Sequence, residues 1–247
     1  MKHGVGEKFQ EETKYDPYMP RDAADSVPAP RAEPFKSYEK PVSLHALPKP
    51  EYPQGTDLWD LLMKRRSRRT FDTERSVPLE RLTRLLWATQ GATRRYGDVV
   101  FRTAPSAGAL YPVETYLSVR AVSGLNPGIY HFRPQAFDLE YLRDRDHSHD
   151  LARAALGQAM VAHAQLTFIW TAVLGRSRWK YRQRAYRYIY LDAGHIGQNL
   201  SLASEAEGLG CCMIGAFFDD HINALLGVDG TEETTIYLAA VGVPVHG

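Results

Sequence analysis

Cysteine, long apolar runs and a charge excess of either sign are all scarce in this sequence of 247 residues. The two cysteines, Cys211 and Cys212, are adjacent and give no disulfide framework, which predicts a reducing, cytoplasmic setting. The formal net charge of +1 argues against general nucleic-acid binding. No apolar run reaches about 18 residues, so we expect no membrane span. Residues 1–15 lack the apolar segment of a secretory signal.

Patterns for metals and dinucleotides are also missing. The nine histidines are scattered, and His147 and His149, which lie in a polar and charged stretch, are expected to be solvated. The glycine-rich run that begins at Gly208 follows a predicted helix instead of a strand, and its spacing does not fit a dinucleotide-binding fingerprint.

Residues 1–56 differ in composition from the rest of the chain, because nine of the fifteen prolines lie there. This density disfavours long helices and favours an extended arm. Six aromatic residues are spaced along the arm and predict that it packs on the core or on a second subunit, with plain disorder as the alternative: Phe9, Tyr15, Tyr18, Phe35, Tyr38 and Tyr52.

Residues 57–247 show interleaved helical and strand patterns, which predict one α+β domain. Helices are expected at 57–66, 78–88, 148–163 and 219–226, and strands at 113–119, 128–132, 137–142, 166–173, 211–214 and 234–243. The longest helical pattern, 181–207, contains no proline and ends at Gly208. Gly194 and Gly197 lie inside it, each costing about 1 kcal/mol relative to Ala. They predict close approach of a second helix, as in the central helix pair of a two-fold dimer.

The segment TAPSAGALYPVETYLSV, residues 103–119, is a loop of small residues followed by a strand. Such a loop lets the backbone lie against a flat ligand, and Ser106 adds a hydroxyl group; an ordinary tight connection is the alternative. The segment KRRSRRTF, residues 64–71, has Arg65, Ser67 and Arg69 on one side if it is extended. Two guanidinium groups and a hydroxyl suit a phosphate, with a solvated basic turn as the alternative.

Together with residues 179–210, these segments resemble the flavin-dependent nitroreductase family, most closely its azoline-dehydrogenase branch (the SagB/ThcOx type). The RRSxRxF, PSAGxxYPxE and KYxxRxYRYxxLDxGHxxQNL elements of that branch match residues 65–71, 105–114 and 180–200, in the expected order. The resemblance spans residues 57–244. It implies a nitroreductase-like fold, with a mixed or antiparallel central sheet flanked by helices, and an intertwined homodimer in which residues 57–247 bind FMN.

The resemblance also implies which residues contact FMN. Arg65, Ser67 and Arg69 would hold the phosphate, and Tyr111 would line the substrate pocket. Backbone of two segments would lie against the flavin ring, with an amide near Gly215 donating to N5: Pro105, Ser106, Ala107 and Gly108, then Met213, Ile214, Gly215 and Ala216. For the second segment, a strand end packed in the core is the alternative. Many nitroreductases have a basic residue after the last strand, whereas this sequence ends VGVPVHG.

Lys180 and Tyr181 match the Lys-Tyr pair that the resemblance ties to azoline oxidation. Forming an azole from an azoline removes one hydride and one proton, so a base must accept the proton. Six basic residues lie within 176–187, before the first acid at Asp192, and their charge would favour a proton-accepting form. We expect this cluster at a helix start, where cations oppose the helix dipole. A structural or substrate-binding surface is the alternative, and His195 is expected to be a buried histidine.

The leading hypothesis is an FMN-dependent dehydrogenase or oxidase that oxidises thiazoline, oxazoline or related rings in peptide natural-product biosynthesis. Its substrate would be a peptide or a small heterocycle, acted on alone, in a biosynthetic complex or on a carrier protein. An NAD(P)H-dependent nitro or quinone reductase is one alternative, and a non-catalytic flavin-binding scaffold subunit is another. The sequence does not distinguish NAD(P)H from oxygen as the redox partner.

Overall fold

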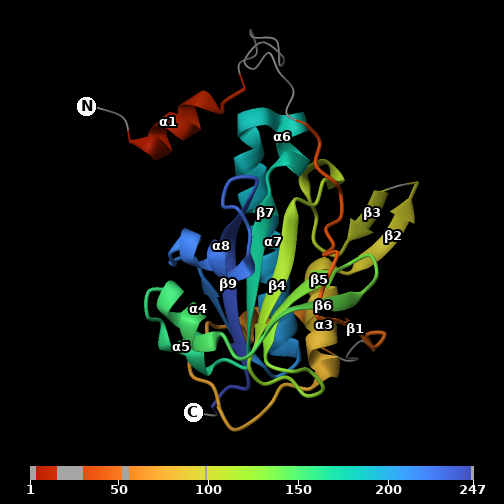
Figure 1. Cartoon of the computed structure of the whole chain (residues 1–247), viewed down its shortest axis with the longest axis vertical. Helices are drawn as coiled ribbons and strands as arrows, with labels where there is room; N and C mark the ends of the chain where they lie inside the picture. Colours follow the sequence, from red (N-terminus) through yellow and green to blue (C-terminus); the bar gives the residue numbers. More distant parts are fainter. Residues whose placement is uncertain (1–3, 16–29, 52–55, 98, 246–247) are drawn as a thin grey trace.

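A computed structural model describes residues 4–15, 30–51, 56–97 and 99–245. At its centre is a seven-stranded sheet in the order β1-β6-β5-β4-β7-β9-β8, in which each neighbouring pair is antiparallel (Figure 1). The strands are β1 (Ser43–Ala46), β4 (Val113–Val119), β5 (Gly128–Arg133), β6 (Asp138–Asp144), β7 (Leu166–Val173), β8 (Gly210–Ile214) and β9 (Glu233–Gly242). A separate hairpin, β2 (Ala92–Tyr96) with β3 (Val99–Arg102), projects from the body.

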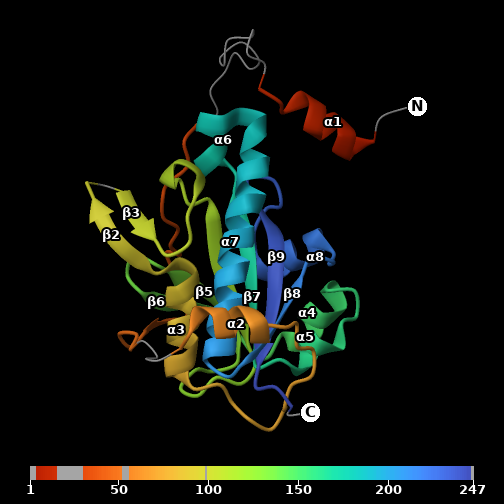
Figure 2. The ribbon, with the colours of Figure 1, turned by 180° about the vertical axis from the view of Figure 1, so that it is seen from behind.

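Helices cover both faces of the sheet, which is why its central strands are apolar on both sides. Every residue of β4 is buried. On one face, Leu117 and Trp170 pack with α3 (Leu79–Gln90) and the long α7 (Ala185–Ala206), over which α2 (Leu58–Lys64) lies in Figure 2. On the other face, Tyr116 and Ile169 pack with α4 (Ser148–Ala154), α5 (Ala159–His163) and α8 (Asp219–Leu226). This alternation along each strand is the pleat expected of a sheet buried on two faces.

Most of the predicted elements are confirmed to within a few residues. The strands at 113–119 and 166–173 and the helix at 219–226 have the predicted bounds. One predicted helix, 148–163, is wrong: it is broken into α4 and α5, because Leu156 and Gly157 both have positive φ, at 57° and 73°. Among the described residues, no helix combines the length and apolar character that a bilayer crossing requires.

The predicted helix 181–207 is also interrupted. The chain first forms α6 (Gly175–Tyr181) and the short 3₁₀ turn η2 (Arg182–Arg184), and only then α7. Arg182 has φ 51°, a left-handed value that ends α6. The close approach at Gly197 is to the sheet of the same chain and not to a second helix. A Cβ there would lie 2.7 Å from Met213 Cε and 3.1 Å from Tyr237 Cε1. Gly194 faces open space.

The described part of the N-terminal arm packs on the core. It contributes one short helix, α1 (Val5–Glu12), and β1, which pairs with β6 at the edge of the sheet. Between them, Lys36 Nζ lies 2.5 Å from Glu233 Oε2 and donates to the Tyr116 hydroxyl at 2.6 Å. Both partners are on sheet strands, so the arm is fixed by a largely buried ion pair. Tyr18 and Tyr52 lie outside the described residues.

A second buried ionic network lies on the same side of the sheet. Glu114 Oε1 pairs with Arg176 at 2.6 Å, and its Oε2 accepts from His131 Nε2 at 3.1 Å. His131 also donates from Nδ1 to Glu140 Oε2 at 2.7 Å. Burial alone would raise the pKa of Glu114, but the charge of Arg176 and the bond from His131 lower it to about 2. Burial opposes the charged form of His131, yet its two carboxylate partners raise its pKa.

Candidate functional site

The PSAG loop is fastened to the long helix by a buried carboxylate. Ser106 Oγ donates to Asp192 Oδ2 at 2.6 Å, and the Ala107 amide donates to Oδ1 at 3.1 Å. Ser106 Oγ in turn accepts from the Tyr111 amide at 2.9 Å. Burial raises the pKa of Asp192, although the bonds from Ser106 and Ala107 act in the opposite direction. The Ser106 hydroxyl therefore holds the loop in shape, a role that the sequence did not indicate.

Asp192 is a site residue that sequence reasoning missed. It is 4% exposed and lies in the middle of α7, on the face that meets the loop and the short 3₁₀ turn η1 (Ala107–Ala109). Its place among apolar helix positions could have indicated a buried carboxylate, and a buried charge needs specific partners.

Gly108 is the point at which the loop meets the predicted Lys-Tyr pair. It has φ 63° and is exposed. A Cβ at this position would lie 2.5 Å from the Tyr181 hydroxyl and 2.8 Å from Lys180 Nζ. Both side chains therefore end against the backbone of Gly108, and only glycine leaves room for them there. The structure brings the predicted loop and the predicted pair together.

The electrostatic setting of this pair differs from the expectation. Arg178 and Lys180 lie in the last turn of α6, not at the start of the long helix. Cations are favourable at a helix C-terminus, so the argument from an unfavourable helix start was wrong for these two residues. Lys180 Nζ lies 5.3 Å from the centroid of the Tyr181 ring, and Tyr181 packs edge-on against Tyr188 at 4.8 Å.

The N-terminal helix sits on the basic turn beside this pair. Arg184 donates to Thr13 O, and Arg187 donates to Gln10 O at 2.6 Å, so two guanidinium groups satisfy carbonyls at the C-terminal end of α1. The Tyr15 hydroxyl lies 3.3 Å from that of Tyr188. The Tyr15 bond and the charges of Arg184 and Arg187 lower the pKa of Tyr188, against the effect of burial.

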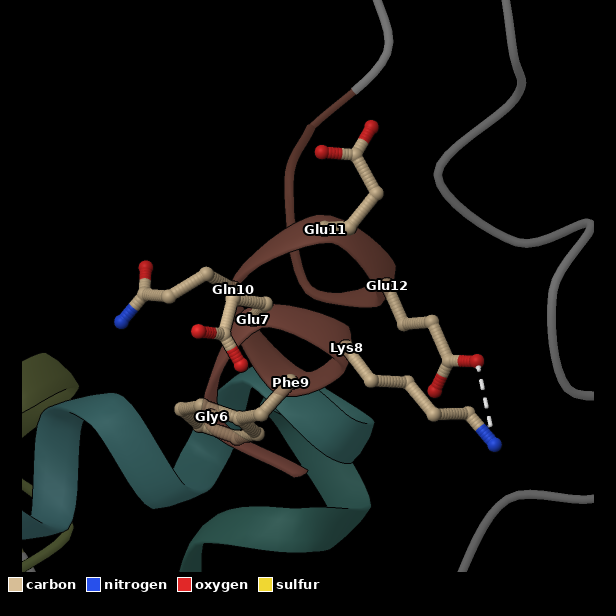
Figure 3. Close-up of a pocket in the computed structure, with 7 residues that line it drawn as sticks. All are labelled: Gly6, Glu7, Lys8, Phe9, Gln10, Glu11 and Glu12. Carbon is tan, nitrogen blue, oxygen red and sulfur yellow. Dashed lines mark ion pairs between the residues drawn. The ribbon is translucent and has the colours of Figure 1, made fainter. Parts of the chain in front are cut away.

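Figure 3 shows the seven residues of α1, Gly6–Glu12, that border a hollow of about 930 Å³. Phe9 is on the side of the helix that faces the α6–α7 ribbon, and the Arg187 guanidinium lies 5.6 Å from its ring centroid. Among the described residues, only those of this exposed helix line the hollow, so we assign it no ligand.

The predicted phosphate-binding segment lies beside β8. Ser67 forms a parallel bridge with Cys211, and the Arg68 amide donates to Cys211 O at 3.0 Å. Arg68 turns toward α7, where it lies 3.7 Å from Glu205. Arg65, Ser67 and Arg69 alternate with it. Within the described part of the chain, neither Arg65 nor Arg69 forms an ion pair, so both charges are available to an anion.

The segment that follows β8 is the second one that is predicted to face the flavin ring. Ile214 is buried and Met213 is half-buried against Gly197, whereas Gly215 and Ala216 are exposed. The backbone is exposed at Gly215 and also at Gly108. The helix α7 contacts the elements next to both, β8 and η1.

The structure also places Tyr111, His195 and His147, and the burial of the two histidines differs from the prediction. Tyr111 has φ 46°, and its hydroxyl accepts from the Arg102 amide at 3.0 Å, so its ring faces β3. It also lines a small pocket with Ser106 and Asp192. His195 is exposed and not buried as expected, and His147 is buried, where its Nε2 lies 2.9 Å from Asp144 O. No cluster of metal-ligating side chains forms among the described residues.

The sequence model of the nitroreductase family matches residues 62–243. The chain belongs to the nitroreductase family. Members of this family are flavin-dependent oxidoreductases. The chain is 37% identical over 185 residues to a protein of Methanocaldococcus jannaschii that is named as a nitroreductase, covering 75% of this chain and 90% of that protein.

Two natural-product processing proteins are also similar to this nitroreductase-family chain. The trifolitoxin-processing protein TfxB of Rhizobium leguminosarum is 30% identical over 118 residues, 46% of this chain and 32% of that protein. The microcin B17-processing protein McbC of Escherichia coli is 25% identical over 136 residues, 53% of this chain and 50% of that protein. The chain thus spans at most half the length of these two relatives.

Among solved structures, a nitroreductase-like protein from Anabaena variabilis superposes with a TM-score of 0.75 and 31% identity, covering 96% of this chain and 46% of that one. A chain of the E. coli microcin synthetase complex has a TM-score of 0.63 at 20% identity, over 81% of this chain and 77% of that one, which shows the shared fold. The predicted nitroreductase-like fold, an antiparallel sheet flanked by helices, is confirmed.

Proposed function

We propose that this protein is an FMN-dependent dehydrogenase that oxidises azoline rings, or closely related heterocycles, in a peptide natural product. One observation carries the proposal: the Tyr181 hydroxyl and Lys180 Nζ both end at Gly108, in the loop that is expected to lie against the flavin. The similarity to TfxB and McbC, which are named for processing trifolitoxin and microcin B17, supports the same class of substrate.

The residues of this chain have distinct roles in the proposed reaction. Bound FMN would supply the hydride acceptor. Arg65 and Arg69 would hold its phosphate, and the exposed backbone at Gly215 would face the ring. The carboxylate of Asp192 keeps the PSAG loop in one conformation through Ser106.

The substrate proton requires a base close to the same loop. Tyr181 and Lys180 are the titratable groups at Gly108, and one of them would accept the proton while the other stabilises the charge left behind. Such a base contributes about 10²–10⁴-fold to the rate. A reductase of nitro groups would not depend on a protein base at this position.

We further propose that the protein acts as a homodimer. Apolar side chains are exposed on α2 and on α7: Leu58 is 54% exposed, Trp59 71%, Met63 76%, Tyr190 57% and Leu191 59%. These two helices lie together on one face (Figure 2). Apolar area of this kind is typical of an interface. Trp59→Glu should produce a monomer by light scattering, and a wild-type protein that is already monomeric would contradict the proposal.

The flavin part of the proposal is tested with purified protein. Arg65→Ala should lower the ratio of FMN to protein, measured by absorbance, because the phosphate loses one of its cations. Arg66→Ala removes the same charge from the next residue, which is exposed on the alternate side of the segment, and should retain FMN. Full flavin occupancy in Arg65→Ala would show that the phosphate binds elsewhere.

The reaction itself is tested with a thiazoline-containing peptide, on which turnover appears as a mass loss of two hydrogens. Lys180→Ala and Tyr181→Phe should keep FMN and lose at least about 100-fold in rate. Lys49→Ala and Tyr96→Phe change the same side-chain types at exposed positions away from Gly108 and should be neutral.

A nitro or quinone reductase is the second candidate, favoured by the 37% identity to the M. jannaschii protein. It predicts rapid nitroarene reduction with NADPH, no azoline oxidation, and near-native rates in Lys180→Ala and Tyr181→Phe. A protein that binds FMN and is inert in both assays would instead be a scaffold subunit.

A further inference from the structure

A small cavity lies beside the candidate site, on the far side of the PSAG turn. It has a volume of about 50 Å³ and is enclosed by the arm, by β3, by the turn that ends at Tyr111 and by Arg176 of α6. In Figure 1 the arm passes between α6 and the β2–β3 hairpin at this place. A single water molecule needs about 10–15 Å³ of such a volume, so the cavity has room for a group of several atoms.

Three arginines line this cavity, Arg31, Arg102 and Arg176. Glu114 pairs with one of them, at 2.6 Å from Arg176, and it also accepts from His131. The wall is therefore strongly positive, with one of its charges compensated by a direct ion pair.

Arg102 is the buried member of this group. Its residue is 6% exposed, and its Nη1 donates to a neutral partner, Gln90 Oε1, at 2.8 Å. Its Nε is buried and has no hydrogen-bond partner among the described residues, and Nη2 forms no hydrogen bond with them either. Burial lowers the pKa of Arg102 to about 10, with a further contribution from Arg176, although Glu114 acts in the opposite direction. Arg102 is thus a buried guanidinium that forms no direct ion pair with the described residues.

The guanidinium plane is held by aromatic rings. Its central carbon lies 4.7 Å from the ring centroid of Tyr111 and 5.8 Å from that of Phe35. Such packing supports the faces of the group and leaves its edge for hydrogen bonds in the plane. Of the two donors on this edge, Nε is fully buried, and Nη2 is the one left to reach a ligand oxygen.

We propose that this cavity binds the carboxylate group of a ligand, with Arg102 donating from Nη2 and Arg31 adding a second positive charge from the arm. The proposal does not depend on the redox reaction. Because Tyr111 lines this cavity and also the pocket with Ser106 and Asp192, a carboxylate bound here touches the turn that carries the PSAG loop. The group can belong to a free small acid or to the C-terminus of a peptide.

The test uses the full chain as purified, with ¹³C-labelled acetate as the probe and with sodium chloride keeping the ionic strength constant. Saturable line broadening of the acetate signal is expected. Arg31→Gln should weaken binding at least about tenfold, because it removes one of the lining charges. Arg95→Gln removes an exposed arginine from the nearby hairpin and should leave binding unchanged. Arg102→Gln, if its circular dichroism spectrum is native, should abolish binding.

Competition then identifies the source of the group. Displacement of acetate by a short peptide with a free C-terminus, but not by its C-terminal amide, indicates a peptide end. Displacement only by small acids indicates a free acid. Absence of saturable acetate binding, equal weakening by Arg95→Gln, or displacement by phosphate or chloride as effective as by acetate would each overturn the proposal.

Discussion

Replacing Gly108 by alanine tests the geometry of the proposed reaction centre directly. The new methyl group would enter a space that already contains the Tyr181 hydroxyl at 2.5 Å and Lys180 Nζ at 2.8 Å. Both are the far ends of side chains, so they would move and the loop would remain. The backbone adds a second effect, since alanine at φ 63° costs about 1–2 kcal/mol relative to glycine.

These two effects can be separated with a matched control. Gly97 has φ 55°, and a Cβ there would meet nothing within 4 Å. Gly97→Ala therefore carries a similar backbone strain without a collision. For a chain of this size, about 2–4 °C of melting temperature corresponds to 1 kcal/mol. Both variants should therefore melt about 2–8 °C below the wild type.

Only Gly108→Ala should lose activity. Displacing a catalytic group by about 1 Å can lower a rate about 100-fold, and here two groups are displaced together. Azoline oxidation followed by mass spectrometry should fall by about that factor in Gly108→Ala, with FMN retained, and should stay near the wild-type rate in Gly97→Ala. If Gly108→Ala keeps the wild-type rate while showing the expected loss of stability, the ends of Lys180 and Tyr181 are not part of the reaction centre.

Three further predictions concern stability. Because the pKa of His131 is raised in the folded protein, its contribution to the free energy of unfolding is fully present below about pH 6.5 and is lost as the pH rises through the folded pKa. The pKa of Glu114 is lowered, so its contribution is present above about pH 4.5 and is lost as the pH falls toward 2. His131→Asn should flatten the alkaline limb of urea unfolding midpoints measured from pH 5 to 9, and an unchanged limb would assign it to another group. Lys36→Met should lower the free energy of unfolding by about 2–3 kcal/mol, less than for a fully buried pair because Lys36 keeps 22% of its side-chain exposure, and adding Glu233→Gln should restore part of the loss in the same denaturation assay. Arg187→Gln removes two bonds to the N-terminal helix and should speed thermolysin cleavage within residues 4–15 about tenfold by mass spectrometry, whereas equal rates would mean that those bonds do not hold the helix.

The regular elements of the domain could be predicted from the sequence because their patterns are local. The strand 113–119 and the helix 219–226 follow from apolar spacing alone. The breaks at Leu156 and Arg182 could not be predicted in this way, because both residues have positive φ values, which L-residues rarely adopt and which apolar spacing does not reveal. Because the helix breaks at Arg182, Lys180 lies at the end of α6 and not at the start of α7.

The site was predictable to the extent that its residues come in contiguous motifs. The loop at 105–108 and the pair at 180–181 are both local motifs, and the structure places them side by side at Gly108, while their roles stay predictions. Asp192 was missed because its role depends on a loop 85 residues away in sequence. The predicted helix-start position of Arg178 and Lys180 was wrong for the same reason. The effect of a helix dipole depends on which end of which helix a charge occupies, and only the fold determines that.

The position of β1 extends the sheet beyond the segment that the family model matches. The similarity to the family begins at residue 62, yet Ser43–Ala46 forms the outermost strand on one side of the sheet and covers the backbone edge of β6. A chain that began at residue 57 would still contain the family segment, but it would present β6 as a free strand, open to pairing with another copy. The arm therefore protects the domain against association through that edge, a role that depends on its backbone more than on its side chains.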